Sequence, residues 1–212
     1  MNNVRAASWV WFCLCGVAVG CGYSAARVEP VDIDPSDASS AAMEMYDKDG
    51  DDALGEQELV AVPGIKRYYG QYDRDGDTKV SREEISQRFE DWANNRLALH
   101  SARVLVHLDG RPLGGATVTF VPEAYLGPNV KPAIGITQSN GVATLSHAHE
   151  DLPKTASGRP IPGVTSGTFK VEITHPSIKI PPRYNQSTEL GEEVAFDLNQ
   201  TGAPTLLSLR SK

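Results

Sequence analysis

The chain has 212 residues, a formal net charge of −7, 40% hydrophobic residues and three cysteines. A chain of this length holds one or two domains. The acidic balance, with a pI of about 5.2, argues against a nucleic-acid-binding protein, which needs a basic surface to displace the counterions around phosphate. The negative charge is concentrated, because residues 43–92 carry seven basic and fourteen acidic side chains. This middle segment therefore accounts for the whole net charge.

The first twenty residues have the pattern of an export signal. Arg5 precedes an uncharged, mostly apolar run, residues 6–20, which is shorter than the about 20 residues that span a bilayer. Cys13, Cys15 and Cys21 all lie in this run or directly after it. The rest of the chain therefore has no disulfide framework.

Cys21 follows Ala18, Val19 and Gly20 at the end of the apolar run. This resembles the lipobox of bacterial lipoproteins, with Ala18 in the place of the usual Leu. The resemblance implies that residues 1–20 are a lipoprotein signal peptide, that Cys21 is lipidated, and that the protein is exported and anchored to a membrane of the bacterial cell envelope. Cleavage after residues 24–26 (Ser-Ala-Ala) is the alternative, and it would release a secreted protein.

The segment after the leader is rich in proline and aspartate. Residues 27–40 contain Pro30, Pro35 and little apolar periodicity, so they bury too little apolar surface to offset the entropy of ordering. We expect residues 21–40 to form a flexible tether.

Two twelve-residue segments of the acidic region, residues 47–58 and 73–84, share one pattern. Calcium takes six to eight oxygens, and an EF-hand loop supplies them from carboxylates at positions 1, 3 and 5, a backbone carbonyl at 7 and a bidentate Glu at 12. Both segments resemble this loop, so the sequence predicts two calcium sites. The expected ligands are Asp47, Asp49, Asp51, the Ala53 carbonyl and Glu58 in the first loop, and Asp73, Asp75, Asp77, the Lys79 carbonyl and Glu84 in the second.

The residues around the loops fit a helical EF-hand pair over residues 41–98. Leu54 and Val80 occupy position 8, where paired loops form a short β-bridge. Ile85, Phe89 and Trp92 recur at helical spacing after the second loop and predict an amphipathic helix. The loops start 26 residues apart and Pro63 interrupts the link between them, so we expect short connecting helices and a fixed pair rather than a wide hinge.

Position 6 departs from the pattern in both loops. A sharp turn there favours Gly at positive φ, yet the residues are Asp52 and Thr78. Asp tolerates the left-handed region, whereas β-branched Thr does so poorly. We expect the second loop to be strained or locally reshaped and to bind calcium more weakly than its carboxylates suggest.

From residue 101 the hydrophobic pattern changes from helical to alternating. Short runs of this kind, separated by turn signals such as Asp109-Gly110, predict a β-sandwich over residues 101–200. Residues 201–212 are expected to be a C-terminal tail. The expected strands lie at residues 104–108, 116–121, 131–138, 141–146, 169–174 and 194–198.

Residues 108–122 (LDGRPLGGATVTFVP) resemble the opening of the carboxypeptidase-regulatory-like, transthyretin-related sandwich of many bacterial surface lipoproteins. The similarity continues through residues 167–171 and 180–185. It implies an antiparallel Greek-key β-sandwich (transthyretin/prealbumin-like) with a structural or adhesive use and no catalytic residues. The expected fold class is therefore α+β multidomain, with the EF-hand pair before the sandwich.

The sequence favours a non-enzymatic, calcium-binding envelope lipoprotein with a structural or adhesive role at the cell surface. Motifs of nucleophilic, zinc-dependent or phosphate-binding catalysis are missing from the sequence. Its expected partners are calcium, a membrane through the lipid on Cys21, and a surface protein or polysaccharide of unknown identity, but no nucleic acid. Two alternatives are a calcium-responsive regulator of a surface partner and a carbohydrate- or substrate-binding accessory module.

Overall fold

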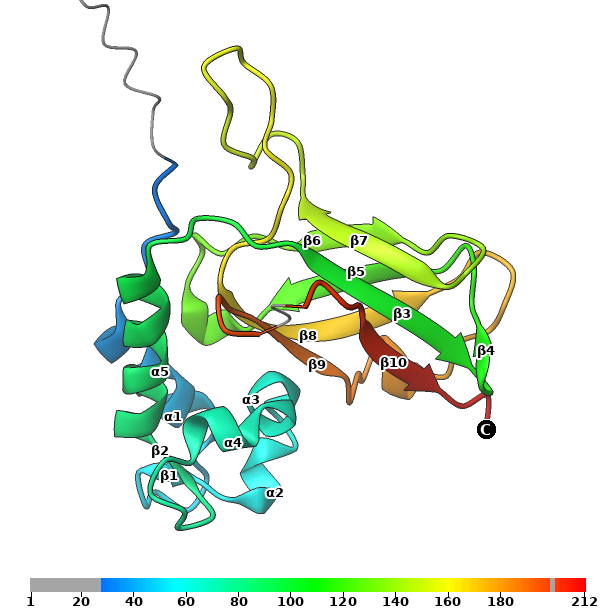
Figure 1. The fold of residues 1–212 in the computed structure, drawn as a ribbon. Coiled ribbons are helices and arrows are strands. Elements are labelled where there is room, and N and C mark those ends of the chain that lie inside the picture. The colour runs from blue at the N-terminus through cyan, green and yellow to red at the C-terminus, as the bar shows by residue number, and fades with distance from the viewer. Residues whose placement is uncertain (1–27, 199–200) are drawn as a thin grey trace, which may run out of the picture.

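The computed structural model describes residues 28–198 and 201–212. It is a mixed α/β structure in which a group of short helices packs beside a curled antiparallel sheet (Figure 1). We call residues 35–95 the helical unit and residues 102–209 the sheet unit. The buried apolar side chains of both units form one continuous cluster. The helices and the sheet therefore share a core, although the sequence patterns predict separate modules.

Helix α1 (Pro35–Tyr46) opens the helical unit. The Asp34 carboxylate caps it by accepting hydrogen bonds from the N–H of Ser36 (2.9 Å) and Asp37 (3.1 Å), and proline is favoured at the first helical position. The expectation of a flexible tether up to residue 40 is wrong for residues 35–40. Asp34 and Pro35, whose residue types suggested a tether, instead begin a helix. Burial of Ala38 and Ser39 in the following turn stabilises that helix.

The rest of the helical unit consists of short elements followed by one long helix, α5. The connecting helices between the acidic loops have only four or five residues each, as the spacing of the loops predicts. The elements are β1 (Ala53–Leu54), α2 (Glu56–Leu59), α3 (Pro63–Arg67), α4 (Tyr69–Tyr72), β2 (Val80–Ser81) and α5 (Arg82–Asn95).

Helix α5 is the amphipathic helix that the sequence predicts. Its start is a capping box in which Ser81 Oγ accepts from the Glu84 N–H, at 3.3 Å, and the Glu84 carboxylate accepts from the Ser81 N–H, at 2.8 Å. Ile85, Phe89 and Trp92 are all buried. Phe89 and Trp92 also stack with ring centroids 4.5 Å apart.

The sheet unit is a single curled sheet, a half-barrel, with strand order β10-β3-β7-β6-β5-β8-β9 and β4 paired to β3. Its neighbours are antiparallel except β10 and β3, which are parallel. This curled antiparallel sheet is compatible with the predicted sandwich. The elements are β3 (Ala102–Leu108), β4 (Arg111–Pro112), β5 (Thr117–Pro122), η1 (Ala124–Leu126), β6 (Ala133–Ile136), β7 (Val142–His147), β8 (Gly167–Thr174), η2 (Pro182–Tyr184), β9 (Gly191–Val194) and β10 (Thr205–Leu209).

Two expectations about the end of the chain are wrong. The last expected strand, at 194–198, is placed too late in the chain. Strand β9 ends at Val194 and the chain then turns, with the Leu198 N–H bonded to the Ala195 carbonyl at 3.3 Å. The expected tail contains β10, whose Leu207 and Leu209 are each 1% exposed. Alternating burial of leucines holds this strand on β3.

Helix α3 joins the two units by packing directly on β9 and β8. The approach is so close that a Cβ on Gly191 would lie 2.1 Å from the Gly64 nitrogen and 2.4 Å from the Pro63 oxygen. Only glycine at position 191 permits this contact. The backbones of α3 and β9 are therefore in direct contact, which fixes the helical unit on the edge of the sheet.

Candidate metal centre

The first acidic loop, residues 47–58, is closed by hydrogen bonds from its own backbone to its two terminal carboxylates. Asp47 accepts from the N–H of Gly50 (2.7 Å) and of Asp52 (2.9 Å). Glu58 accepts from the N–H of Lys48 (2.5 Å) and of Gly55 (2.8 Å). Positions 1 and 12 are thereby held across the loop from each other.

The second acidic loop, residues 73–84, repeats this network at the same positions. Asp73 accepts from the N–H of Gly76 (2.8 Å) and of Thr78 (3.3 Å). Glu84 accepts from the N–H of Arg74 and of Ser81, both at 2.8 Å. Two segments of different sequence thus reach one arrangement, with the acidic residues at positions 1 and 12 as its fixed points.

The two loops are joined at their eighth positions. Strands β1 and β2 pair antiparallel, with Leu54 opposite Val80 and both side chains fully buried. The predicted pairing of these two residues is confirmed. Asp52 and Thr78, at position 6, have φ values of 66° and 75°. The left-handed turn expected there is present in both loops. In the second loop it falls on Thr78, a β-branched residue that tolerates this conformation poorly.

Three carboxylates converge in each loop. Oxygens of Asp47, Asp49 and Glu58 lie within 4.8 Å of one another, and so do those of Asp73, Asp75 and Glu84. Oxygens at this spacing can share one cation as ligands. The position-5 residues, Asp51 and Asp77, are not part of these groups; each instead accepts from the N–H of residue 53 (3.1 Å) or 79 (2.8 Å).

The remaining predicted ligands are the carbonyls of Ala53 and Lys79, at position 7. Ala53 is in β1, opposite Ser81. Lys79 directly precedes β2, and its ammonium forms an ion pair with Asp51 of the first loop. This ion pair lowers the pKa of Asp51. The second loop thus contributes a positively charged side chain, that of Lys79, to the first loop.

The second loop is set more firmly into the protein than the first. Glu84 is 7% exposed, and although burial opposes it, hydrogen bonds from the N–H of Ser81 and Arg74 lower the pKa of this carboxyl. The Tyr69 hydroxyl donates to Asp73, which lowers the pKa of Asp73 and raises that of Tyr69 to about 12. Both terminal carboxylates are therefore stabilised in the charged form that binds a cation.

A second set of charged residues lies where the two units meet, and the sequence patterns do not reveal it. Three glutamates of the sheet unit are almost fully buried: Glu123, Glu192 and Glu193 are 2%, 2% and 0% exposed. Burial raises the pKa of all three. The helical unit supplies most of their partners, among them Tyr46, which donates to Glu123 at 3.0 Å.

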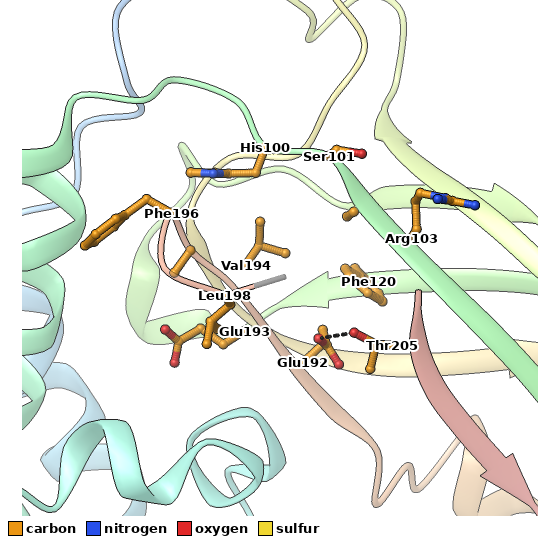
Figure 2. A pocket seen from close by; sticks show the side chains of 12 residues that line it. His100, Ser101, Arg103, Phe120, Glu192, Glu193, Val194, Phe196, Leu198 and Thr205 are labelled. Atoms are coloured by element: carbon orange, nitrogen blue, oxygen red, sulfur yellow. Dashed lines mark hydrogen bonds between the residues drawn. The ribbon is translucent and has the colours of Figure 1, made fainter. Parts of the chain in front are cut away.

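Glu192 and Glu193 are consecutive on β9 and border a cavity of about 180 Å³ between β9 and the start of β3 (Figure 2). Glu192 accepts from Thr205 Oγ1 at 3.1 Å and from the Tyr68 hydroxyl. Phe120 and Val194 form part of the apolar lining. The cavity lining is therefore partly apolar and partly charged, and its Glu192 carboxylate already accepts hydrogen bonds from the protein.

The predictions for the start of the chain, the signal peptide 1–20 and lipidation at Cys21, lie outside the described residues. Within residues 28–198 and 201–212, no helix has the length and apolarity required to cross a membrane. Comparison of the chain with family models, with curated proteins and with solved structures gives no match.

Proposed function

We propose that the helical unit is an EF-hand pair that binds two calcium ions. The observation that carries this proposal is the repeated network of the two loops, in which position 1 accepts from the N–H of positions 4 and 6, and position 12 from those of positions 2 and 9. The network gathers three carboxylates at the centre of each loop. Like charges gathered in this way repel one another, and a bound dication would offset that repulsion.

The donor chemistry favours calcium over other metals. Both loops offer oxygen donors only, and neither contains His or Cys, so softer metals such as zinc lose their preferred ligands. Magnesium demands near-ideal octahedral geometry and holds its water tightly, whereas calcium accepts six to eight oxygens in a flexible arrangement. In an exported protein, a Kd of about 10⁻⁴–10⁻³ M would suffice.

The wider role follows from the remaining expectations. The sheet unit would be a Greek-key sandwich of the carboxypeptidase-regulatory-like kind, and Cys21 would anchor the chain to the cell envelope. Calcium would stabilise the fold by mass action, because it binds the folded loops and not the unfolded chain. A structural or adhesive role at the surface, toward a protein or polysaccharide partner, is the function that these features support best.

Calorimetric calcium titration tests the metal sites. The wild-type chain should show two sites, while Glu58→Gln and Glu84→Gln should each show one, since each removes the ligand at position 12. Glu56→Gln and Glu83→Gln are matched controls, because they make the same charge change within each loop at a residue outside the network. A wild-type chain without binding heat, or controls that lose as much as the ligand variants, would refute the sites.

The anchor is tested separately by mass spectrometry of the chain recovered from membranes. A lipidated Cys21 at the new N-terminus is the expected species, and Cys21→Ser should abolish it. A mature chain that begins after residues 24–26 would instead support the secreted alternative.

A further inference from the structure

Both ends of the second acidic loop are next to residues that lie near one buried carboxylate, that of Glu193. Asp73, at position 1, directly follows Tyr72, the last residue of α4. Glu84, at position 12, is one helical turn before Arg88 on α5. Tyr72, Arg88 and Glu193 are 0%, 2% and 0% exposed. The first and last ligands of this loop are thus connected to the same point inside the protein.

The contact from α5 is a buried ion pair. Arg88 donates to Glu193 through Nε at 2.8 Å and also through Nη2, and it donates to Asp197 at 2.8 and 2.9 Å. Trp92, one turn further along α5, donates through Nε1 to the same Glu193 oxygen at 3.3 Å. A buried ion pair is costly when one partner is displaced, since the other charge is then left without compensation.

The Tyr72 hydroxyl, at the end of α4, lies near the same carboxylate without a hydrogen bond to it. Glu193 Oε2 and Tyr72 Oη are both buried without a hydrogen-bond partner. A hydrogen bond between these two groups would join α4 to β9, as Arg88 joins α5 to it.

The first acidic loop is connected differently. Its position-12 residue, Glu58, belongs to α2, a four-residue helix that packs on α3 and β1 rather than on the sheet. Its position-1 residue, Asp47, follows Tyr46, which binds Glu123 at the start of η1. Neither end of the first loop reaches β9 in this arrangement.

We propose that a cation in the second loop locks β9 of the sheet onto the helical unit, by fixing the end of α4 and the start of α5 so that Tyr72 and Arg88 meet at Glu193. The inference rests on the proposed cation site of this loop. It adds that the two sites are unequal, since only the second controls the edge of the sheet.

Simple geometry and linkage explain the mechanism. One ion coordinated by both Asp73 and Glu84 sets the separation of α4 from α5, and that separation decides whether both helices contact Glu193 together. Coupling between two sites is reciprocal. The ion therefore stabilises the contact of β9 with α4 and α5. In return, an intact Glu193 raises the affinity of the second loop for the ion.

Calcium titration in a Glu58→Gln background, which keeps only the second site, tests the coupling. Adding Glu193→Gln should weaken that site by about tenfold, within the range usual for allosteric coupling. Glu192→Gln is the matched control, because it changes the neighbouring buried glutamate, whose partners are Arg67 of α3, Tyr68 directly after it and Thr205 of β10. The control should weaken the second site less than twofold.

Hydrogen exchange of residues 191–194 in the full chain provides a second readout that does not depend on a core substitution. Calcium should slow this exchange in the wild type and in Glu58→Gln, and should leave it unchanged in Glu84→Gln. Equal calcium affinity with and without Glu193→Gln, or exchange in β9 that ignores calcium while two ions bind, would overturn the coupling alone. A wild-type chain that binds no calcium would overturn the sites and the coupling together.

Discussion

The contact between Gly191 and α3 leads to a sharp prediction for Gly191→Ala. The added Cβ would lie 2.1 Å from both the Gly64 nitrogen and the Pro63 carbonyl carbon. These atoms belong to the backbone, so no side chain can turn away to make room. We expect β9 and α3 to separate by more than about 1 Å, a gap that already forfeits a quarter to a half of each van der Waals contact across it.

The expected loss of stability is about 3 kcal/mol. Val62, directly before α3, and Ile65, within it, are fully buried, and partial loss of their packing costs roughly 1 kcal/mol each. The hydrogen bond from Tyr68 to Glu192 crosses the same contact and contributes about 1 kcal/mol more. The sum lies at the upper end of the range for overpacked sites.

Urea unfolding followed by tryptophan fluorescence measures this loss. The sequence has tryptophan at 9, 11 and 92, so a chain without its first twenty residues reports through Trp92 alone, which is buried beside Glu193. Gly70→Ala is the control, because its Cβ would meet nothing within 4 Å in α4. That control should be neutral or stabilising by up to about 1 kcal/mol. If the two variants have equal unfolding free energies, the reasoning about Gly191 is wrong.

Three further predictions follow from the sites. Thr78→Gly should raise the calcium affinity of the second loop, because a left-handed residue costs roughly 1–2 kcal/mol that glycine avoids; an unchanged affinity in calorimetry would show that the turn is not strained. Glu123→Gln should gain stability relative to the wild type as the pH rises above 4.5, the ordinary pKa of a glutamate. Burial raises the pKa of Glu123 in the folded chain, so its ionisation favours unfolding. Urea unfolding across pH measures this, and parallel pH profiles of the two chains would contradict it. Tyr69→Phe should raise the pKa of Asp73 in the metal-free chain, because its main stabilising donor is lost; carbon-detected NMR titration of the carboxyl group measures it, and Tyr68→Phe should leave it unchanged.

The acidic loops could be predicted from the sequence because their information is local. The two terminal carboxylates, the position-6 turn and the position-8 strand residues of each loop all lie within twelve residues. The resemblance to the EF-hand loop therefore places Leu54 opposite Val80 and puts a positive-φ turn at Asp52 and Thr78, as the structure has them. The amphipathic pattern of α5 is equally local, with one turn separating successive buried residues.

The connections between the units could not be predicted in this way. Arg88 and Glu193 are 105 residues apart in the sequence, and without knowledge of such a partner a charged residue is expected to be exposed to solvent. The two charged residues Glu192 and Glu193 therefore break the apolar pattern of β9, although all four residues of this strand are buried. Strand β10 was missed for a related reason, since its pairing with β3 joins residues about 100 positions apart and its apolar run is short.

The parallel pairing of β10 with β3 has a mechanical consequence. Strand β3 follows the helical unit, and β10 runs beside it in the same direction to the C-terminal end of the chain (Figure 1). A pull applied between the start of β3 and the end of β10 would slide the strands along each other. All five paired positions would then resist together, whereas a pull at right angles would open them one by one. The sheet is therefore arranged to bear tension along its length.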